Sequence, residues 1–308
     1  MQAFLGIFIS AVAFFSIISI AALAGLFSER VGIVNIAIDG MMIVGATFYG
    51  LFGQIFNIAN PWLQIPLLLI SAATTGLFAL LHGFVTIKLK GDHIISGVAL
   101  NLLAPAISIT MLKLFGEGNK FSSPTPELAL STSQSSLGNL VSLKLFLTLA
   151  IGIVVLVVLN KTKWGLRLRA IGENPQAADV VGINVNSFKW QGVFISGLLA
   201  GIAGGLFFQL RGIAFSGGVE GIGFLALAVL IMGQWKASLI FVFSIVFAAI
   251  YSTSLQIGAG QGSFTAVKDY SNIINIIPYA FTIAILIFSS KNSKAPAAVG
   301  QPYDKSKR

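Results

Sequence analysis

The 308-residue sequence contains no cysteine and few charged residues. The absence of cysteine excludes disulfide bonds and metal sites built on thiolates. Charged residues make up 9% of the chain, whereas about 25% is usual for a soluble domain. Hydrophobic residues make up 56%, and the mean hydropathy is +0.91. Such a composition indicates a chain that lies largely in a membrane.

Motifs for catalysis and energy conversion are also missing. No G-x-x-x-x-G-K-[ST] phosphate-binding loop occurs, so we expect no ATP site in this chain. The two histidines, His82 and His93, are too few and too poorly spaced to predict a metal site. Asp39 and Glu220 alone do not form the converging set of side chains that an intramembrane enzyme needs. We therefore expect no cofactor, no metal and no catalytic residue in this chain.

Nine apolar runs approach the length of about 20 residues that a transmembrane helix needs. They cover residues 3–27, 36–56, 63–87, 94–115, 143–159, 192–210, 218–233, 237–257 and 273–288. No basic segment precedes the first run, so we interpret it as a membrane span rather than a signal peptide. The sequence therefore predicts an all-α integral membrane protein with about nine transmembrane helices, in a range of eight to ten, within one domain of residues 1–290.

Lysine and arginine are unevenly distributed between the two sides of this topology. When the runs alternate in direction and the loop 161–189 is placed in the cytoplasm, 14 of the 19 basic residues lie on the cytoplasmic side. The five that lie outside are Lys113, Lys120, Lys144, Arg211 and Lys268. Since cytoplasmic loops carry the excess of basic residues, we expect the amino terminus outside the cell and the carboxyl terminus in the cytoplasm.

Two polar stretches differ from the rest of the chain. Residues 116–140 contain SSPTPELALSTSQSS and are predicted to form a flexible outer loop. Residues 291–308 form a basic cytoplasmic tail that we expect to be disordered, with its Lys and Arg side chains near anionic lipid headgroups. Anchoring at the membrane surface is the simplest role for this tail.

The loop 161–189 contains seven charged residues and a predicted short helix. Asn174 is suited to cap a helix amino terminus, and Pro175 is suited to the first helical position. Gly182 is placed to end the helix in a left-handed turn. A helix of only about 10 Å is marginal in water on its own. It either rests on its own bundle or docks a cytoplasmic partner, and we expect Ala178 within it to be exposed to water.

Two acids fall within the apolar runs, where charge is costly and usually functional. Asp39 lies in the tripeptide IDG and Glu220 in VEG, each near the start of a run, and the two runs are antiparallel in this topology. Such pairs are what an inverted repeat would leave, although three residues can also match by chance. Each acid either lines a translocation pathway or forms an ion pair or helix cap, with Glu29, Arg30 and Arg211 as candidate neighbours.

Four neutral polar residues are further candidates for a translocation pathway. They are Asn35, Ser96, Asn101 and Gln209, and each can both donate and accept hydrogen bonds. Hydrogen bonding between neighbouring helices is the alternative role for all four. The first role would suit a neutral, hydroxylated solute, since such a solute needs hydrogen bonds but no fixed counter-charge.

The segment GLRLRAIGENPQAADVVGINV at 165–185 resembles the cytoplasmic coupling loop of ABC importer permeases in the nucleoside and simple-sugar family. Four further stretches are similar to this family in the same order. They are LFSERVGIVNIAIDGMMIVGA at 26–46, GDHIISGVALNLLAP at 91–105, GVEGIGFLALAVLIMGQW at 218–235 and AVGQPYDKSKR at 298–308. The resemblance covers nearly the whole chain and is strongest to the second permease subunit of nucleoside importers.

The resemblance implies a permease subunit in a bacterial plasma membrane, driven by a separate ABC ATPase that holds ATP and Mg. It implies that the short helix seats on that ATPase through Gly172, Glu173, Asn174, Pro175, Ala177, Ala178, Asp179 and Gly182. Further implied partners are a second permease subunit, an extracellular substrate-binding lipoprotein and membrane lipid, and no nucleic acid polymer. Nucleosides are the implied cargo. Simple sugars, branched-chain amino acids and an ion-coupled secondary transporter remain the alternatives.

Overall fold

The computed structural model describes residues 2–56, 60–121, 127–131, 137–259, 270–289 and 294–305. In this part of the chain the secondary structure is helical, apart from two isolated β-bridges. The helices are α1 (Gln2–Arg30), α2 (Ile38–Phe56), α3 (Gln64–Gly83), α4 (His93–Phe115), α5 (Leu143–Lys161), α6 (Lys163–Glu173), α7 (Pro175–Val180), α8 (Val185–Arg211), α9 (Ile222–Met232), α10 (Ala237–Gly258), α11 (Ser271–Ile274) and α12 (Ile277–Ser289).

Seven helices within the described ranges are long and apolar enough to cross a membrane: α1, α2, α3, α4, α5, α8 and α10. The expected all-α membrane architecture is therefore confirmed, but the expected number of nine full spans is not. The runs 218–233 and 273–288 form the shorter helices α9, of 11 residues, and α12, of 13 residues. At 1.5 Å per residue α9 is only about 16 Å long, which is about half the thickness of a bilayer core.

Backbone conformation explains why α9 is short. Gly217, Glu220 and Gly221 all have positive φ angles, which a right-handed helix excludes. After α8 and a short 3₁₀ helix at Gly212–Ala214, the chain therefore becomes helical again only at Ile222. A count of apolar residues over this run does not detect the change, because glycine counts as part of an apolar run whatever its φ angle.

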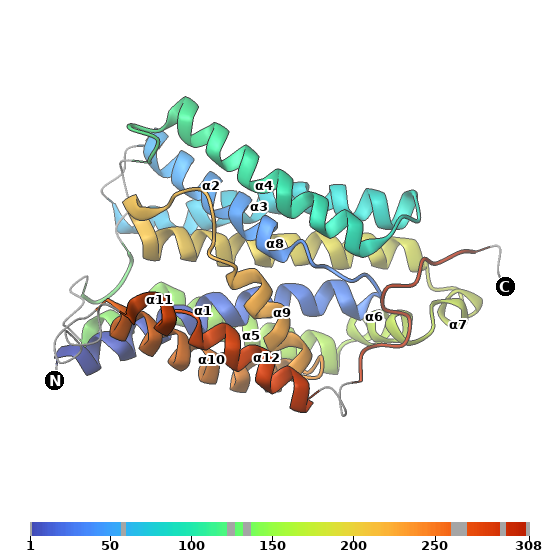
Figure 1. The fold of residues 1–308 in the computed structure, drawn as a ribbon. Coiled ribbons are helices and arrows are strands. Elements are labelled where there is room, and N and C mark those ends of the chain that lie inside the picture. Colours follow the sequence, from blue (N-terminus) through green and yellow to red (C-terminus); the bar gives the residue numbers. More distant parts are fainter. Residues whose placement is uncertain are drawn as a thin grey trace.

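α8 lies at the centre of the bundle. Figure 1 shows it between one group formed by α2, α3 and α4 and a second group that contains α1, α5, α9, α10 and α12. Small residues allow this close packing. A Cβ atom added at Gly204 would lie 2.1 Å from the carbonyl oxygen of Met42, and one at Gly201 would lie 2.5 Å from that of Ser71. The core thus depends on direct backbone contact between α8 and its neighbours α2 and α3.

The two ends of the bundle carry different structures. α6 and α7 lie at one end together with the described part of the carboxyl-terminal tail, whereas the amino terminus and α11 lie at the other (Figure 1). The predicted cytoplasmic loop and the tail are thus on the same side. Their location relative to the cell interior stays a prediction.

The two polar stretches are more ordered than expected where the structure describes them. In the predicted outer loop, Phe121 is buried, and the N–H of Leu130 donates to the carbonyl oxygen of Val141 at 3.0 Å. The tail residues 294–305 lie against α6 and the end of α1 rather than extending into solvent. Single apolar residues such as Phe121 and Tyr303 are buried and attach these stretches to the bundle, although the stretches are polar on average. The Ser- and Thr-rich parts at 122–126 and 132–136, and tail residues 291–293 and 306–308, lie outside the described residues.

Candidate functional site

Residues 31–37 connect α1 to α2, and side chains from α3 and α4 supply hydrogen bonds to the middle of this segment. His82 of α3 lies 3.0 Å from the carbonyl oxygen of Val34 through Nε2. His93 of α4 accepts from the N–H of Val34 through Nδ1 at 3.2 Å. The hydroxyl oxygen of Ser96 lies 2.9 Å from Nδ1 of His82. A buried backbone segment must have its polar groups satisfied, and these two histidines do so for Val34.

Asn101 and Asn35 hold the second half of the same segment. The amide of Asn101 donates to the carbonyl oxygen of Ile36 at 2.9 Å and accepts from the N–H of Gly40 at 2.7 Å. Asn35 is fully buried and donates to the hydroxyl oxygen of Ser196 on α8 at 2.9 Å. Its Oδ1 atom has no hydrogen-bond partner within the described residues. Asn101 therefore caps the start of α2, while Asn35 connects the segment to α8.

Asp39 joins the start of α2 to the start of α9. Its carboxylate accepts a hydrogen bond of 2.9 Å from the N–H of Gly223, in the first turn of α9. A Cβ atom at Gly223 would lie 2.3 Å from the Cα atom of Asp39, so only glycine allows the two helices to approach this closely. A carboxylate at a helix amino terminus satisfies a free N–H and favours the positive end of the helix dipole. Asp39 is therefore a helix-end cap.

Glu220 forms an ion pair and marks a polar face. Its carboxylate pairs with the guanidinium of Arg211 and accepts from the hydroxyl of Tyr251 at 3.2 Å. The hydroxyl of Tyr279 donates to the backbone carbonyl of Glu220 at 2.7 Å. The Glu220 side chain remains 45% exposed. Within a bilayer core, non-helical backbone and exposed charge are tolerated only next to protein or a water-filled cavity.

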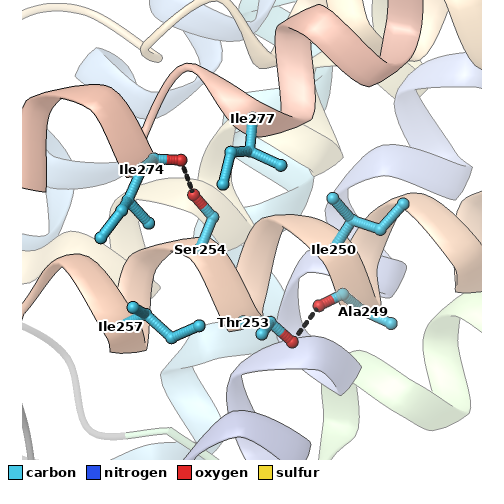
Figure 2. Close-up of a pocket in the computed structure, with 7 residues that line it drawn as sticks. All are labelled: Ala249, Ile250, Thr253, Ser254, Ile257, Ile274 and Ile277. Carbon is cyan, nitrogen blue, oxygen red and sulfur yellow. Dashed lines mark hydrogen bonds between the residues drawn. The ribbon is translucent and has the colours of Figure 1, made fainter. Parts of the chain in front are cut away.

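A cavity of about 280 Å³ lies beside this region but has the wrong chemistry for a hydroxylated solute. Figure 2 shows it between α10 and the segment that contains α11 and α12. The hydroxyls of Thr253 and Ser254 both donate to backbone carbonyls, those of Ala249 and Ile274. The other lining residues are apolar. The cavity therefore offers no hydroxyl donor for a polar ligand and is suited to an apolar chain.

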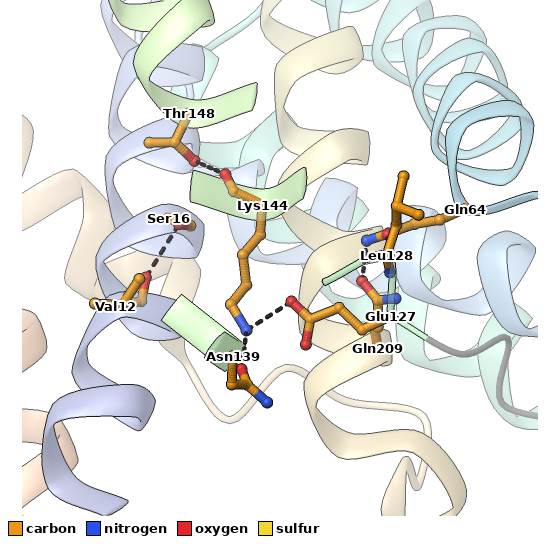
Figure 3. A network of polar contacts seen from close by, with 9 residues as sticks. All are labelled: Val12, Ser16, Gln64, Glu127, Leu128, Asn139, Lys144, Thr148 and Gln209. Atoms are coloured by element: carbon orange, nitrogen blue, oxygen red, sulfur yellow. Dashed lines mark hydrogen bonds and ion pairs between the residues drawn. The ribbon is translucent and has the colours of Figure 1, made fainter. Parts of the chain in front are cut away.

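Gln209 belongs to a separate network at the end of the bundle opposite α7. Its side-chain oxygen accepts from Gln64, whose own side-chain oxygen accepts from the N–H of Leu128 at 2.9 Å (Figure 3). In the same region Lys144 forms an ion pair of 2.7 Å with Glu127. These contacts attach the loop residues 127–131 to the bundle. Gln209 thus does not join the other pathway candidates.

The six predicted pathway residues therefore form two groups. Asn35, Asp39, Ser96 and Asn101 come together around residues 31–40, with Glu220 reached through the start of α9, whereas Gln209 lies apart. Most of them hold helices together, which is the alternative role considered for them. Sequence patterns do not indicate His82, His93, Ser196 or Tyr279, because the groups that these four residues bond lie far away in the sequence. The predicted inverted repeat stays a prediction.

The predicted short helix forms as α7. The Asn174 side chain accepts from the N–H of Ala177 at 2.9 Å, Pro175 occupies the first turn, and Gly182 has a φ of +85°. Glu173, Asn174, Ala177 and Gly182 are exposed, and Asp179 is partly exposed. Gly172, Pro175 and Ala178 are buried, so the expectation that Ala178 is exposed to water is wrong.

Two apolar residues extend the exposed face of this hairpin. Val180 is 72% exposed and Val181 is 75% exposed, and sequence reasoning missed both. Ala178 faces inward because Ile171, Val185 and Tyr303 form a small apolar cluster around it. The docking of a partner on this exposed face stays a prediction.

Within the described residues, seven helices long and apolar enough to cross a membrane indicate a multi-pass membrane protein. The chain belongs to the family described as branched-chain amino acid transport system / permease component, whose model matches residues 7–289. Its helices α1 to α12 thus make up a permease subunit.

Curated relatives match the chain over almost its full length. It is 37% identical over 304 residues to the nucleoside ABC transporter permease protein NupC of Lactococcus lactis subsp. cremoris, covering 93% of this chain and 92% of that protein. It is 37% identical over 305 residues to the guanosine ABC transporter permease protein NupQ of Bacillus subtilis, covering 94% and 93%. The guanosine ABC transporter permease protein NupP of Bacillus subtilis is 27% identical over 297 residues, covering 90% and 82%. No solved structure matches the chain significantly.

Proposed function

We propose that this chain is one membrane-spanning subunit of an ABC importer that carries nucleosides. The observation that supports this most is the similarity to NupC and NupQ over more than nine-tenths of each chain. Both relatives are named as nucleoside or guanosine transporter permeases.

The importer is proposed to contain at least three further proteins. An ABC ATPase, which binds ATP and Mg, docks on α7 through Glu173, Asn174, Ala177, Val180 and Val181. A second permease subunit covers the exposed faces of the spans; the existence of both NupQ and NupP in one organism supports such a pair. An extracellular binding lipoprotein delivers the nucleoside. The amino terminus then lies outside, and α7 and the tail lie in the cytoplasm.

The translocation pathway is proposed to follow the face that carries Glu220 and Arg211. These side chains are partly exposed, with 45% and 28% of their areas accessible, at a point where the backbone is not helical. Water or the second permease must cover this face, because lipid cannot. Asn101, which is also partly exposed, lies near α2 at the same junction.

Cargo-stimulated ATP hydrolysis tests this function. The complex of both permeases, the ATPase and the binding lipoprotein is reconstituted, and hydrolysis is measured with purine nucleosides, ribose or leucine. We expect purine nucleosides to raise the rate above the basal level and the other solutes to leave it unchanged. Stimulation by ribose or leucine alone would refute the nucleoside cargo but leave the permease role intact.

A further inference from the structure

The described part of the carboxyl-terminal tail joins two elements, α6 and the segment 31–37, at the α7 end of the bundle. The N–H of Ala298 donates to the carbonyl oxygen of Gly172 at 2.8 Å, at the end of α6. The N–H of Gly300 donates to the carbonyl oxygen of Gly32 at 3.1 Å, at the start of the non-helical segment 31–37. Backbone hydrogen bonds thus link one short stretch of the tail both to the end of α6 and to the segment 31–37.

The tail also has two side-chain anchors. Tyr303 is 9% exposed and belongs to the apolar cluster with Ile171, Ala178 and Val185. Asp304 forms an ion pair of 3.0 Å with Lys90, in the connection between α3 and α4. One anchor therefore holds the underside of α7, and the other holds the helices that supply His82 and His93.

The hairpin of α6 and α7 also touches the end of α1 directly. A Cβ atom at Gly172 would lie 2.4 Å from the carbonyl oxygen of Arg30. The ammonium of Lys189, at the start of α8, lies 6.0 Å from the centre of the Tyr303 ring. The tail therefore closes a continuous set of contacts from α7 to the segment whose backbone is held by His82, His93 and Asn101.

We propose that residues 296–304 act as a strap that positions α7 relative to the segment 31–37 and transmits its movement to the start of α2. This proposal rests on the proposed importer function. The strap is needed because α7 has only six residues, and a helix so short has no rigid position of its own. Tyr303 is a positioning residue: it keeps α7 seated, and the hydrogen bonds of Ala298 and Gly300 link that position to Gly172 and Gly32.

The direct test compares Tyr303→Ala, Tyr303→Phe and Gln301→Ala in the assembled importer. Gln301 is an exposed residue of the same strap and serves as the control. Nucleoside uptake per ATP hydrolysed is measured in vesicles, with co-purification of the ATPase measured in parallel. We expect Tyr303→Ala to lower this ratio at least about fivefold, within the usual range of coupling between sites. Tyr303→Phe and Gln301→Ala should keep it, and the ATPase should remain bound in all three.

An unchanged ratio for Tyr303→Ala would overturn the strap. Hydrogen exchange gives a readout that does not depend on the cargo: in the permease, the amides of residues 171–183 should exchange faster in Tyr303→Ala than in the wild type. Unchanged exchange would likewise contradict the proposal. If the wild-type complex transports no nucleoside yet Tyr303→Ala still raises exchange at α7, then the importer assignment fails while the strap contact stands.

The ion pair provides a second route if Tyr303→Ala does not accumulate in the membrane. Lys90→Asp alone places two acids together and should lower uptake per ATP. Lys90→Asp combined with Asp304→Lys restores the pair and should recover the ratio. No recovery in the double variant would contradict a positioning role for this anchor.

Discussion

Asp39 and Glu220 lie in similar tripeptides, yet their contacts give them different roles. Asp39 is buried and holds the N–H of Gly223, across 184 residues of sequence. Glu220 is half-exposed and pairs with Arg211. Both acids match the alternatives expected for them, an ion pair and a helix cap. Only Glu220 also lies on an accessible face, so it is the stronger candidate for contact with a solute.

Substitution of Asp39 separates a cap from a charge in the pathway. Asp39→Asn keeps an oxygen that can accept from Gly223, whereas Asp39→Ala leaves a buried N–H unsatisfied at a cost of about 1–3 kcal/mol. We expect Asp39→Ala to lower the thermal unfolding temperature in detergent and Asp39→Asn to keep both stability and transport. A stable Asp39→Asn protein that no longer transports would show that the charge itself is required.

Substitutions of Glu220 and Arg211 test the proposed pathway face. The pair is accessible to solvent, so its loss should change unfolding little. We expect Glu220→Gln to reduce nucleoside uptake in vesicles without reducing the amount of folded protein. The exchange of both residues, Glu220→Arg with Arg211→Glu, keeps the pair but moves the charges. Full activity in the exchanged protein would mean that the pair is structural and that the face does not contact the cargo.

At the scale of elements, the start and the end of α7 could be predicted from the sequence. Its caps are local, since Asn174, Pro175 and Gly182 act within one turn of the helix. Its inward face could not be predicted, because Ala178 is buried partly by Tyr303, which lies far away in the sequence. A docking test must therefore use the outward face rather than Ala178.

Replacement on the outward face of α7 should block docking without disturbing the fold. Ala177→Arg and Val180→Asp both change exposed side chains. We expect normal insertion and stability for each, with loss of ATPase co-purification and of uptake. Ala178→Arg serves as a contrasting variant: it places a charge in the apolar cluster and should loosen the hairpin, seen as faster proteolysis between α6 and α8. Normal ATPase binding by Val180→Asp would place the docking surface elsewhere.

The long helices could also be predicted, since seven of the nine apolar runs form helices long and apolar enough to cross a membrane. The errors have two physical causes, backbone conformation and contacts between residues that are distant in sequence. A sliding count of apolar residues does not register backbone conformation, and α9 is shortened by positive φ angles at Gly217, Glu220 and Gly221. The hydrogen bonds around residues 31–37 come from α3, α4 and α8, so no local pattern contained them. The tail was misjudged for the same reason: its partners Gly32, Lys90 and Gly172 are distant in sequence.

At the scale of the whole molecule, orientation can be tested with single cysteines, because the chain has none of its own. Glu117 is exposed at the end of α4, and Ala177 is exposed on α7. We expect Glu117→Cys to react with an impermeant thiol reagent added to intact cells. Ala177→Cys should react only after the membrane is permeabilised. The opposite labelling pattern would reverse the topology and place α7 outside the cell.

The central claim is that this permease moves nucleosides with energy taken from a partner ATPase through α7. Its most direct test is uptake of a labelled purine nucleoside into proteoliposomes that contain the full complex, with the binding lipoprotein outside and the ATPase facing the inside. We predict uptake when ATP and Mg are enclosed, none with a non-hydrolysable ATP analogue, and none with Val180→Asp. Uptake that proceeds without ATP and stops when an ion gradient is collapsed would contradict the account.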